Sequence, residues 1–222
     1  QETLTAMTEN QPWVYWQTLL DIGGLDDWFG EFKAILNEPT HAVEIERLLM
    51  GRPKHAGADF KARPEQAELA LWGYYLNDSA LASWLARLPL SNADKDILAL
   101  VQQHQSTLTK IYLTSQTLLR GHTDSSLALD QHVETVLRVF EKFDVARRPE
   151  RLERCLAIHA WYCSTVNPDF SATDFFALFM RLQAAVKQVN VQSIIAQGYQ
   201  GVAIKAQLRA EQLTALKHIF CV

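Results

Sequence analysis

The chain has 222 residues, 48% of them hydrophobic, and a formal net charge of −4 at pH 7. This length and composition are enough to bury a sizeable core, in one domain or in two small ones. The negative charge argues against a protein that binds nucleic acids through its overall charge, and the lack of an apolar run of about eighteen residues argues against a membrane span. Three cysteines do not make a disulfide framework, so we expect a cytoplasmic protein.

The two ends of the chain differ in charge. Residues 1–46 hold nine acids and a single base, Lys33, which gives a net charge of −8, so the remainder sums to +4. Residues 183–222 alone have a net charge of +3. The first residue is Gln1 and no basic-then-apolar leader follows it, so we expect a shortened chain or the later part of a longer polypeptide, with no sign of secretion. The charge asymmetry points to a charged binding partner but does not identify it.

Hydrophobic periodicity predicts helices in the first part of the chain. Their expected ranges are Pro12 to Ile22, Asp26 or Asp27 to Pro39, Thr40 to Gly51, Pro64 to Leu76 and Ala80 to Leu88. Gly23 and Gly24 suit the C-cap of the first helix, and Asp26 or Asp27 can cap the second. Residues 52–63 have no apolar period and are predicted to form a flexible connection.

The second part of the chain shows the same helical periodicity. Three helices are expected to start at Ser91, at Pro149 and at Ser171 or Thr173. Two more are expected to cover Val133 to Phe143 and Val191 to Ala196, and a last helix is expected to end at Phe220. Residues 121–126 read as a turn. No Asn-Gly or Asp-Gly turn separates β-branched runs, so no hairpin is expected. The sequence therefore predicts an all-α fold of roughly ten helices.

Two motifs resemble catalytic or metal sites and are better explained by helix structure. Asp94 and Asp96 have the spacing of a metal-binding pair, but they open a helix, where such residues diverge and where acids favour the helix dipole. Cys155, His159 and Cys163 follow one stripe of a helix that rises about 12 Å over eight residues, too far for one metal ion to bind all three. We expect the stripe to be core and find no credible catalytic centre.

Four arginines gather where two predicted helices meet. Asp144, Val145 and Ala146 break the first helix pattern, and Pro149 suits the first turn of the second helix. The arginines are Arg147, Arg148, Arg151 and Arg154. Guanidinium groups at such a corner bind phosphate or carboxylate well, because each can donate two parallel hydrogen bonds. The alternative is a solvated corner with an internal Glu150–Arg154 pair.

A second candidate is the turn from Gly198 to Gly201, which precedes the closing helix. Glycines there let the backbone turn sharply and expose the first N–H groups of the helix, which can hold a phosphate. Lys205 and Arg209, one helical turn apart, would flank that site. The alternative is an ordinary corner between two helices.

These two corners resemble the carboxy-terminal part of bacterial class II tRNA nucleotidyltransferases, the CCA-adding enzymes and related poly(A) polymerases. In that family a Lys/Arg-Pro-x-Arg corner follows a helix ending in Asp-Ala, and a glycine–aromatic–x–glycine turn leads into a late helix. Here the matches are Asp144 with Arg148-Pro149-Glu150-Arg151, and Gly198-Tyr199-Gln200-Gly201 with Ile204 and Leu208. Residues 16–31 are similar to the family's L-x-x-x-G-x-L-x-x-x-F-P-E stretch, with Gly30 in place of proline.

The resemblance implies an elongated multi-helix array, with neck-like helices in residues 1–51, a body in residues 52–122 and a tail in residues 123–222. It implies that the chain holds tRNA for CCA addition at the 3′ end, while a catalytic head, absent from these residues, binds Mg²⁺ with CTP and ATP. Besides tRNA, that head is the expected partner, and no cofactor is expected in this chain. Some relatives carry a His-Asp phosphohydrolase in the body, but Tyr74-Tyr75 or Asn77-Asp78 replaces His-Asp here, so the metal-binding histidine is missing.

By this resemblance, a set of basic residues and turn glycines is the expected RNA-binding site. Its members are Arg147, Arg148, Arg151, Gly198, Gly201, Lys205 and Arg209. Trp72, Tyr74, Tyr75 and Trp84 are also aromatic candidates for base stacking, with burial in the core as the alternative. The rival function is a non-catalytic scaffold for protein interaction or dimerisation, with the acidic amino end and Trp13, Trp16 and Trp28 as its contact surface.

Overall fold

The computed structural model describes residues 2–51, 64–121 and 126–221, apart from the side chains of residues 4, 28 and 64–67. The predicted flexible connection at residues 52–63 and most of the predicted turn at residues 121–126 lie outside the described residues.

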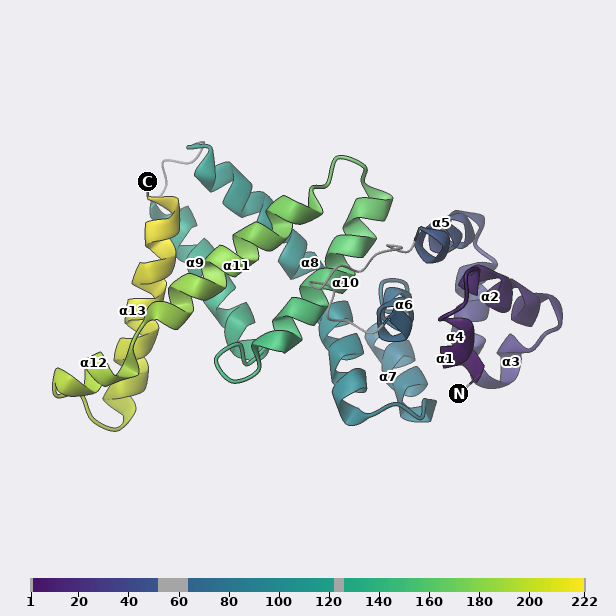
Figure 1. Ribbon diagram of the computed structural model, residues 1–222, viewed down its shortest axis with the longest axis horizontal. Coiled ribbons are helices and arrows are strands. Elements are labelled where there is room, and N and C mark those ends of the chain that lie inside the picture. Colours follow the sequence, from purple (N-terminus) through teal and green to yellow (C-terminus); the bar gives the residue numbers. More distant parts are fainter. Residues whose placement is uncertain (1, 52–63, 122–125, 222) are drawn as a thin grey trace. The chain divides into compact units, whose positions relative to one another are not determined.

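Every regular element of the described residues is an α-helix, which confirms the predicted all-α fold (Figure 1). The helices are α1 (Glu2–Ala6), α2 (Pro12–Asp21), α3 (Leu25–Trp28), α4 (Gly30–Leu36), α5 (Pro39–Met50), α6 (Pro64–Trp72), α7 (Asp78–Arg87), α8 (Asn92–Leu119), α9 (Ser126–Lys142), α10 (Pro149–Val166), α11 (Ala172–Gln188), α12 (Val191–Ala196) and α13 (Val202–Phe220). Within the described ranges, no helix combines the length and the apolar content that crossing a membrane requires.

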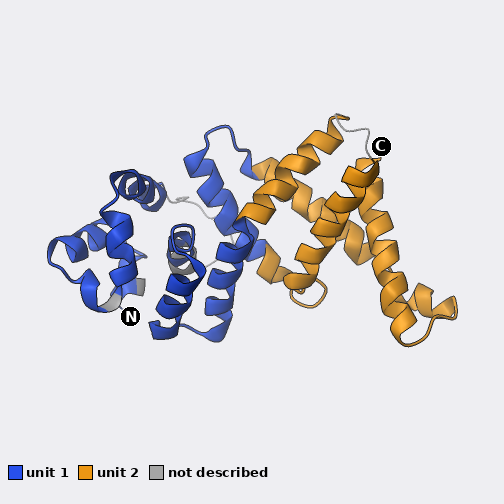
Figure 2. Cartoon of the chain, turned by 180° about the vertical axis from the view of Figure 1, so that it is seen from behind, with its two compact units in different colours: residues 1–105, 153–172 blue, residues 106–152, 173–222 orange. Residues whose placement is uncertain are grey.

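The chain divides into two compact units, which Figure 2 shows in different colours. Unit 1 contains residues 1–105 and 153–172, and unit 2 contains residues 106–152 and 173–222. The chain thus passes between the units three times, within α8, within α10 and at the start of α11. The three segments named from the resemblance stay a prediction.

An aromatic cluster forms the centre of unit 1. The rings of Phe32 and Trp72 stack with their centroids 4.1 Å apart, and Trp16 meets Trp72 edge-on at 4.7 Å. Trp84 meets Phe32 at 4.8 Å. All four side chains have at most 1% of their surface exposed. The hypothesis of base stacking is therefore wrong for Trp72 and Trp84, because packing against other helices already covers their faces.

The burial of Trp16 also removes one residue from the contact surface of the rival scaffold hypothesis, because its ring is fully enclosed. Trp13 is half-buried. The large apolar side chains exposed among the described residues up to 51 are instead Val14, Ile22, Val43 and Met50.

The segment predicted as one helix after Gly24 consists of two, α3 and α4. Phe29 separates them with φ −137° and ψ 34°, and its side chain packs edge-on against Trp16, with ring centroids 5.1 Å apart. Asp26 and Asp27 lie inside the first turn of α3, and Gly24 is its N-cap, so the predicted aspartate cap is wrong. Burial of Phe29 outweighs the continuity of the helix pattern, which periodicity alone does not reveal.

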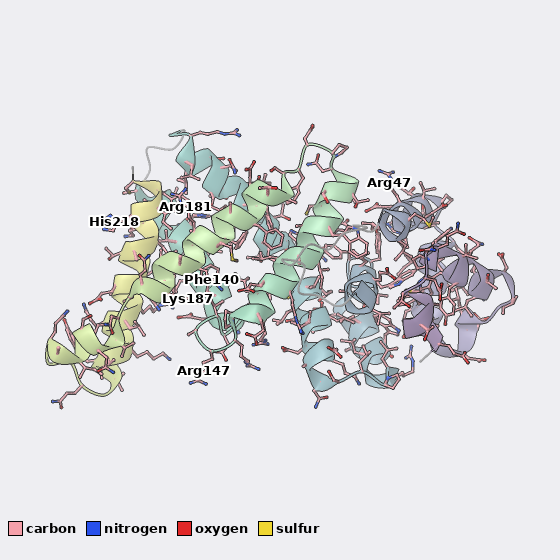
Figure 3. All side chains as sticks on the ribbon, viewed as in Figure 1. Arg47, Phe140, Arg147, Arg181, Lys187 and His218 are labelled. Atoms are coloured by element: carbon pink, nitrogen blue, oxygen red, sulfur yellow. The ribbon has the colours of Figure 1, made fainter. Side chains whose placement is uncertain are left out.

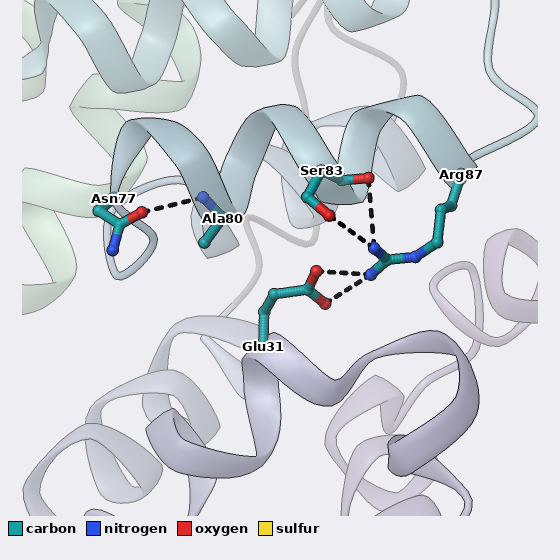
Figure 4. A network of polar contacts seen from close by, with 5 residues as sticks. All are labelled: Glu31, Asn77, Ala80, Ser83 and Arg87. Atoms are coloured by element: carbon teal, nitrogen blue, oxygen red, sulfur yellow. Dashed lines mark hydrogen bonds and ion pairs between the residues drawn. The ribbon is translucent and has the colours of Figure 1, made fainter.

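A polar network joins α4 to α7 within unit 1 (Figure 4). One guanidinium nitrogen of Arg87, Nη2, donates to both carboxylate oxygens of Glu31 at 2.6 Å, and Nη1 donates to the Ser83 hydroxyl at 2.8 Å. Burial raises the pKa of Glu31, but the hydrogen bonds and charge of Arg87 lower it by more, so the net shift of the pKa is downward. At the other end of α7, the Asn77 side chain caps the helix by accepting from the Ala80 N–H at 2.9 Å.

Arg87→Ala is expected to lower the free energy of unfolding by about 1 kcal/mol. This is the upper end of the stabilisation that partly exposed ion pairs provide, and we expect it here because the guanidinium binds both oxygens of the carboxylate. The matched control is Lys33→Ala, which removes an ion pair with Asp26 whose two side chains are about half exposed, and its expected cost is at most about 0.5 kcal/mol. Since the folded-state pKa of Glu31 is lowered, its contribution is present above the unfolded pKa and is lost as pH falls. Urea unfolding measures both variants, and an equal loss of unfolding free energy in the two would show that the Arg87 pair stabilises the protein no more than the exposed Lys33 pair does.

Two helix interpretations of apparent sites are confirmed. The Ser91 hydroxyl accepts from the Asp94 N–H at 3.2 Å, so Asp94 lies in the first turn of a capped helix. Cys155, His159 and Cys163 are buried in unit 1, and Nε2 of His159 lies 3.5 Å from the Cys163 sulfur.

Candidate nucleic-acid interface

The turn between α9 and α10 is fixed by its backbone. Asp144 has a positive φ of 53°, and its N–H donates to the Glu141 carbonyl at 3.1 Å. The Val145 N–H donates to the Phe140 carbonyl at 3.0 Å, and the Val145 and Phe140 side chains are both buried. This is the hydrogen-bond pair of a Schellman motif, with buried apolar residues at the two positions that commonly pack together in it. The corner predicted from the sequence is therefore a rigid support for the residues that follow it.

The arginines of this corner differ in how their side chains are held. The N–H groups of Arg147 and Arg148 donate to the Asp144 carbonyl at 3.0 and 2.8 Å, which sets the direction of the backbone. The Arg147 side chain is exposed on the loop, as Figure 3 shows. Nε of Arg148 donates to the Asp144 carboxylate at 3.2 Å and leaves the rest of its guanidinium accessible. Arg151 is half-buried and donates to the Phe143 carbonyl at 3.4 Å.

The alternative of an internal pair at this corner is not seen: no ion pair joins Glu150 to Arg154 in the part of the chain that the structure describes. Arg154 is half-buried.

The second predicted turn depends on two glycines with positive φ, Gly198 at 92° and Gly201 at 54°. No atom lies within 4 Å of the position that a Cβ would take at either glycine, so the backbone angle alone requires glycine. The Ala203 and Ile204 N–H groups donate to the Gln200 and Gly201 carbonyls at 3.1 and 3.3 Å. Two of the first N–H groups of α13 are thus already used within the turn, which leaves fewer donors for a phosphate than the sequence indicated.

Gly201→Ala is expected to destabilise the protein by about 1–3 kcal/mol, because φ 54° with ψ −126° is a strained conformation for any residue with a Cβ. Gly30→Ala is the control, since Gly30 also has open space at its Cβ position and no positive φ. That control is expected to be neutral or to stabilise by up to about 1 kcal/mol. Thermal unfolding followed by circular dichroism measures both, and a Gly201→Ala variant as stable as Gly30→Ala would contradict the strain argument.

Charged pairs dock α13 against α9. The guanidinium of Arg209 donates to the carboxylates of both Glu134 and Glu141, and the Lys217 ammonium lies 2.6 Å from the Asp130 carboxylate. Lys205 is exposed. In this structure Arg209 therefore faces α9, and a phosphate would have to compete with two carboxylates for it, whereas Lys205 faces solvent.

A cavity of about 260 Å³ lies between the α9–α10 turn, α11 and α13, all in unit 2. Asp144, Val145 and Ala146 line it on one side, and Lys205 and Arg209 line it on the other. The start of the α9–α10 turn and the two predicted cations of α13 are therefore neighbours in space. Gly198 and Gly201 do not line this cavity.

The remaining tyrosine candidates belong to a polar cluster in unit 1. The Tyr74 hydroxyl lies 2.7 Å from Nδ1 of His159, and the Tyr74 ring stacks on Tyr162 with centroids 3.8 Å apart. The Tyr162 hydroxyl donates to the Glu44 carboxylate at 3.2 Å. Burial lowers the pKa of His159 to about 4, so this histidine is neutral at physiological pH. Periodicity indicated a buried stripe at His159 but not its tyrosine partner, which lies 85 residues away in sequence.

No three His, Cys, Asp or Glu side chains among the described residues are arranged to hold a metal ion. The chemical capacity of unit 2 thus consists of exposed cations on a fixed turn beside a small cavity, an arrangement suited to binding an anionic chain.

The sequence of this chain is similar to the C-terminal part of bacterial proteins named Multifunctional CCA protein. It is 24% identical over 243 residues to the Multifunctional CCA protein of Psychromonas ingrahamii, a match that covers 98% of this chain and 54% of the relative. The proteins of the same name from Pseudomonas syringae pv. syringae and Haemophilus influenzae are 25% and 26% identical, over 98% and 97% of this chain and 55% of each relative. The chain therefore spans about half the length of the curated relatives it matches. No family model and no solved structure matches it.

Proposed function

We propose that this chain is the tRNA-binding C-terminal region of a CCA-adding tRNA nucleotidyltransferase, which positions tRNA for CCA addition to its 3′ end. The observation that carries the proposal is the match of nearly the whole chain to proteins named Multifunctional CCA protein. The exposed cations of unit 2 support it, because Arg147 and Arg148 on the α9–α10 turn and Lys205 on α13 are accessible to phosphates.

In this proposal the region contributes binding and position, and the chemistry belongs to a catalytic head outside these residues, together with Mg²⁺, CTP and ATP. Cations that contact phosphates neutralise the backbone and release counterions, so they read the shape of the RNA and not its sequence. The proposed location of such an enzyme is the cytoplasm, where tRNA is processed.

The test is tRNA binding by the full chain, titrated over salt concentration, for the wild type and for Arg148→Ala/Arg151→Ala. We expect binding to weaken as salt rises, and the slope of log K against log salt to fall by roughly one to two in the double variant, because each lost phosphate contact removes about one unit. The matched control is Lys110→Ala/Arg120→Ala, which removes the same charge from exposed positions of unit 2 away from both corners. An equal change of slope in both double variants would show that the corner has no special role.

The rival function is a scaffold for protein interaction or dimerisation. Salt distinguishes it from RNA binding, because an apolar interface changes little with salt whereas phosphate contacts weaken steeply. A wild-type chain that fails to bind tRNA even at low salt would overturn the proposed autonomous RNA binding and favour the scaffold.

A further inference from the structure

The cavity of unit 2 differs from the cationic surface around it in having an apolar interior. Leu137 and Phe140 of α9 are almost fully enclosed, and Val186 of α11 and Leu208 of α13 are half-buried at its walls. Its volume of about 260 Å³ lies below the range of about 300–1,000 Å³ that pockets for drug-sized ligands occupy. The cavity is therefore large enough for one ring system and too small for a double-stranded end.

Polar groups stand at the rim of this apolar interior. Glu141 and Asp144 each bind an arginine through one carboxylate oxygen and keep the other as an acceptor. The Gln212 side chain offers an amide that both donates and accepts. Such groups are matched to the edge of a nucleobase, which carries amino donors and carbonyl or ring-nitrogen acceptors, while its faces are apolar.

One exposed cation lines the cavity and a second is bonded to one of its lining residues. Lys205 lines the cavity from α13. On the side of the turn, Nε of Arg148 lies 3.2 Å from the carboxylate of the lining residue Asp144. A nucleotide that placed its base in the cavity would thus find positive charges close by for its neighbouring phosphates. This complementarity favours RNA over an apolar peptide as the occupant, because an apolar peptide would offer no negative charge to Lys205 or to the accessible part of the Arg148 guanidinium.

We propose that this cavity receives one unpaired nucleobase of the RNA that unit 2 binds, with the flanking phosphates held at Arg148 and Lys205. This inference rests on the proposed function and adds a site for a base to a surface otherwise suited to phosphates. Proteins that recognise RNA commonly take up unstacked bases in this way, between apolar side chains and with hydrogen bonds to the base edge.

The first experiment titrates the isotope-labelled full chain with AMP, CMP, GMP and UMP, and with ribose 5-phosphate as the control that lacks a base. We expect at least one nucleotide to shift the backbone amide signals of Ala146, Lys205 and Gln212 and to bind about fivefold or more tightly than ribose 5-phosphate, the least that stacking of one base provides. Equal binding of all five compounds would show that only phosphate is recognised and would overturn the proposal.

The second experiment fills the cavity without changing its charge. Ala146 is exposed and lines the cavity, so Ala146→Trp is expected to weaken tRNA binding by about fivefold or more while the salt slope stays that of the wild type. Ala203→Trp is the matched control, because Ala203 is exposed on α13 and does not line the cavity. Gln212→Leu, which keeps the volume and removes the amide, is expected to abolish the preference for a nucleotide over ribose 5-phosphate.

The outcomes separate this inference from the function on which it rests. If tRNA binds and the Arg148→Ala/Arg151→Ala variant weakens it, but Ala146→Trp and Ala203→Trp bind alike, the base site is wrong and the phosphate surface stands. If a mononucleotide binds the cavity and tRNA does not displace it, the ligand is a free nucleotide and the proposed RNA base is excluded.

Discussion

Replacing Trp72 by alanine is expected to lower the free energy of unfolding of unit 1 by about 3–5 kcal/mol, the usual cost of removing a large aromatic side chain from a core. The Trp72 ring is stacked on Phe32 with an interplanar angle of 11°, and it contacts Trp16 on another side. Its removal would leave a void lined by two rings that α2 and α4 hold in place, so the surrounding helices can collapse only partly into it.

The control for this variant is Trp72→Phe, which keeps an aromatic ring at the stacking position. The indole N–H of Trp72 has no hydrogen-bond partner among the described residues, so the smaller ring removes a buried donor as well as some volume. We expect a cost below about 1.5 kcal/mol for this swap. Urea unfolding of the full chain measures both variants, and a loss within about 0.5 kcal/mol for the alanine variant would mean that the cluster does not hold unit 1 together.

Acidification from pH 6.5 toward pH 4 is expected to destabilise each unit by about 3 kcal/mol through one buried histidine. Burial lowers the pKa of His132 in unit 2 and of His159 in unit 1, each from 6.5 to about 4. The unfolded chain binds a proton more readily than the folded one, so the stabilisation is complete above pH 6.5 and is lost as pH falls through that interval. The Ser115 hydroxyl, 2.9 Å from Nε2 of His132, partners the ring in unit 2.

The variants His132→Gln and His159→Gln test this expectation, because a side chain that does not titrate removes that histidine's contribution to the pH dependence of its unit. The free energy of unfolding is to be measured by urea at several pH values between 4 and 7. His218→Gln is the control, since His218 is exposed on α13. A pH slope that survives both core substitutions would place the acid sensitivity of the protein elsewhere.

Local signals in the sequence were sufficient to predict much of unit 2. The break after Phe143, the start at Pro149 and the glycine turn at residues 198–201 are confirmed, because each depends on backbone chemistry that a few neighbouring residues determine. Ser91 as a cap is confirmed for the same reason. The cap at Asn77 was missed because the helix was expected to begin at Ala80, whereas α7 begins at Asp78.

Contacts between distant elements could not be predicted from one sequence. Periodicity shows which face of a helix is apolar, but not which other helix it meets. The pairing of Arg209 with Glu134 and Glu141 joins residues 75 and 68 positions apart, and it changes the interpretation of that arginine from an open cation to a docking group. The cavity beside Lys205 depends on the same docking and has no signature in the sequence.

The attachment of α13 through Arg209 has a consequence for how sequences of this kind can diverge. One side chain binds two acids, so Arg209→Glu alone would bring three carboxylates together, and loss of Arg209 would leave Glu134 and Glu141, two turns apart on the same face of α9, without the cation that they share. Substitutions at these three positions are therefore coupled. Homologues that keep this docking are expected to change all three together, or to replace the charges with an apolar contact in one step.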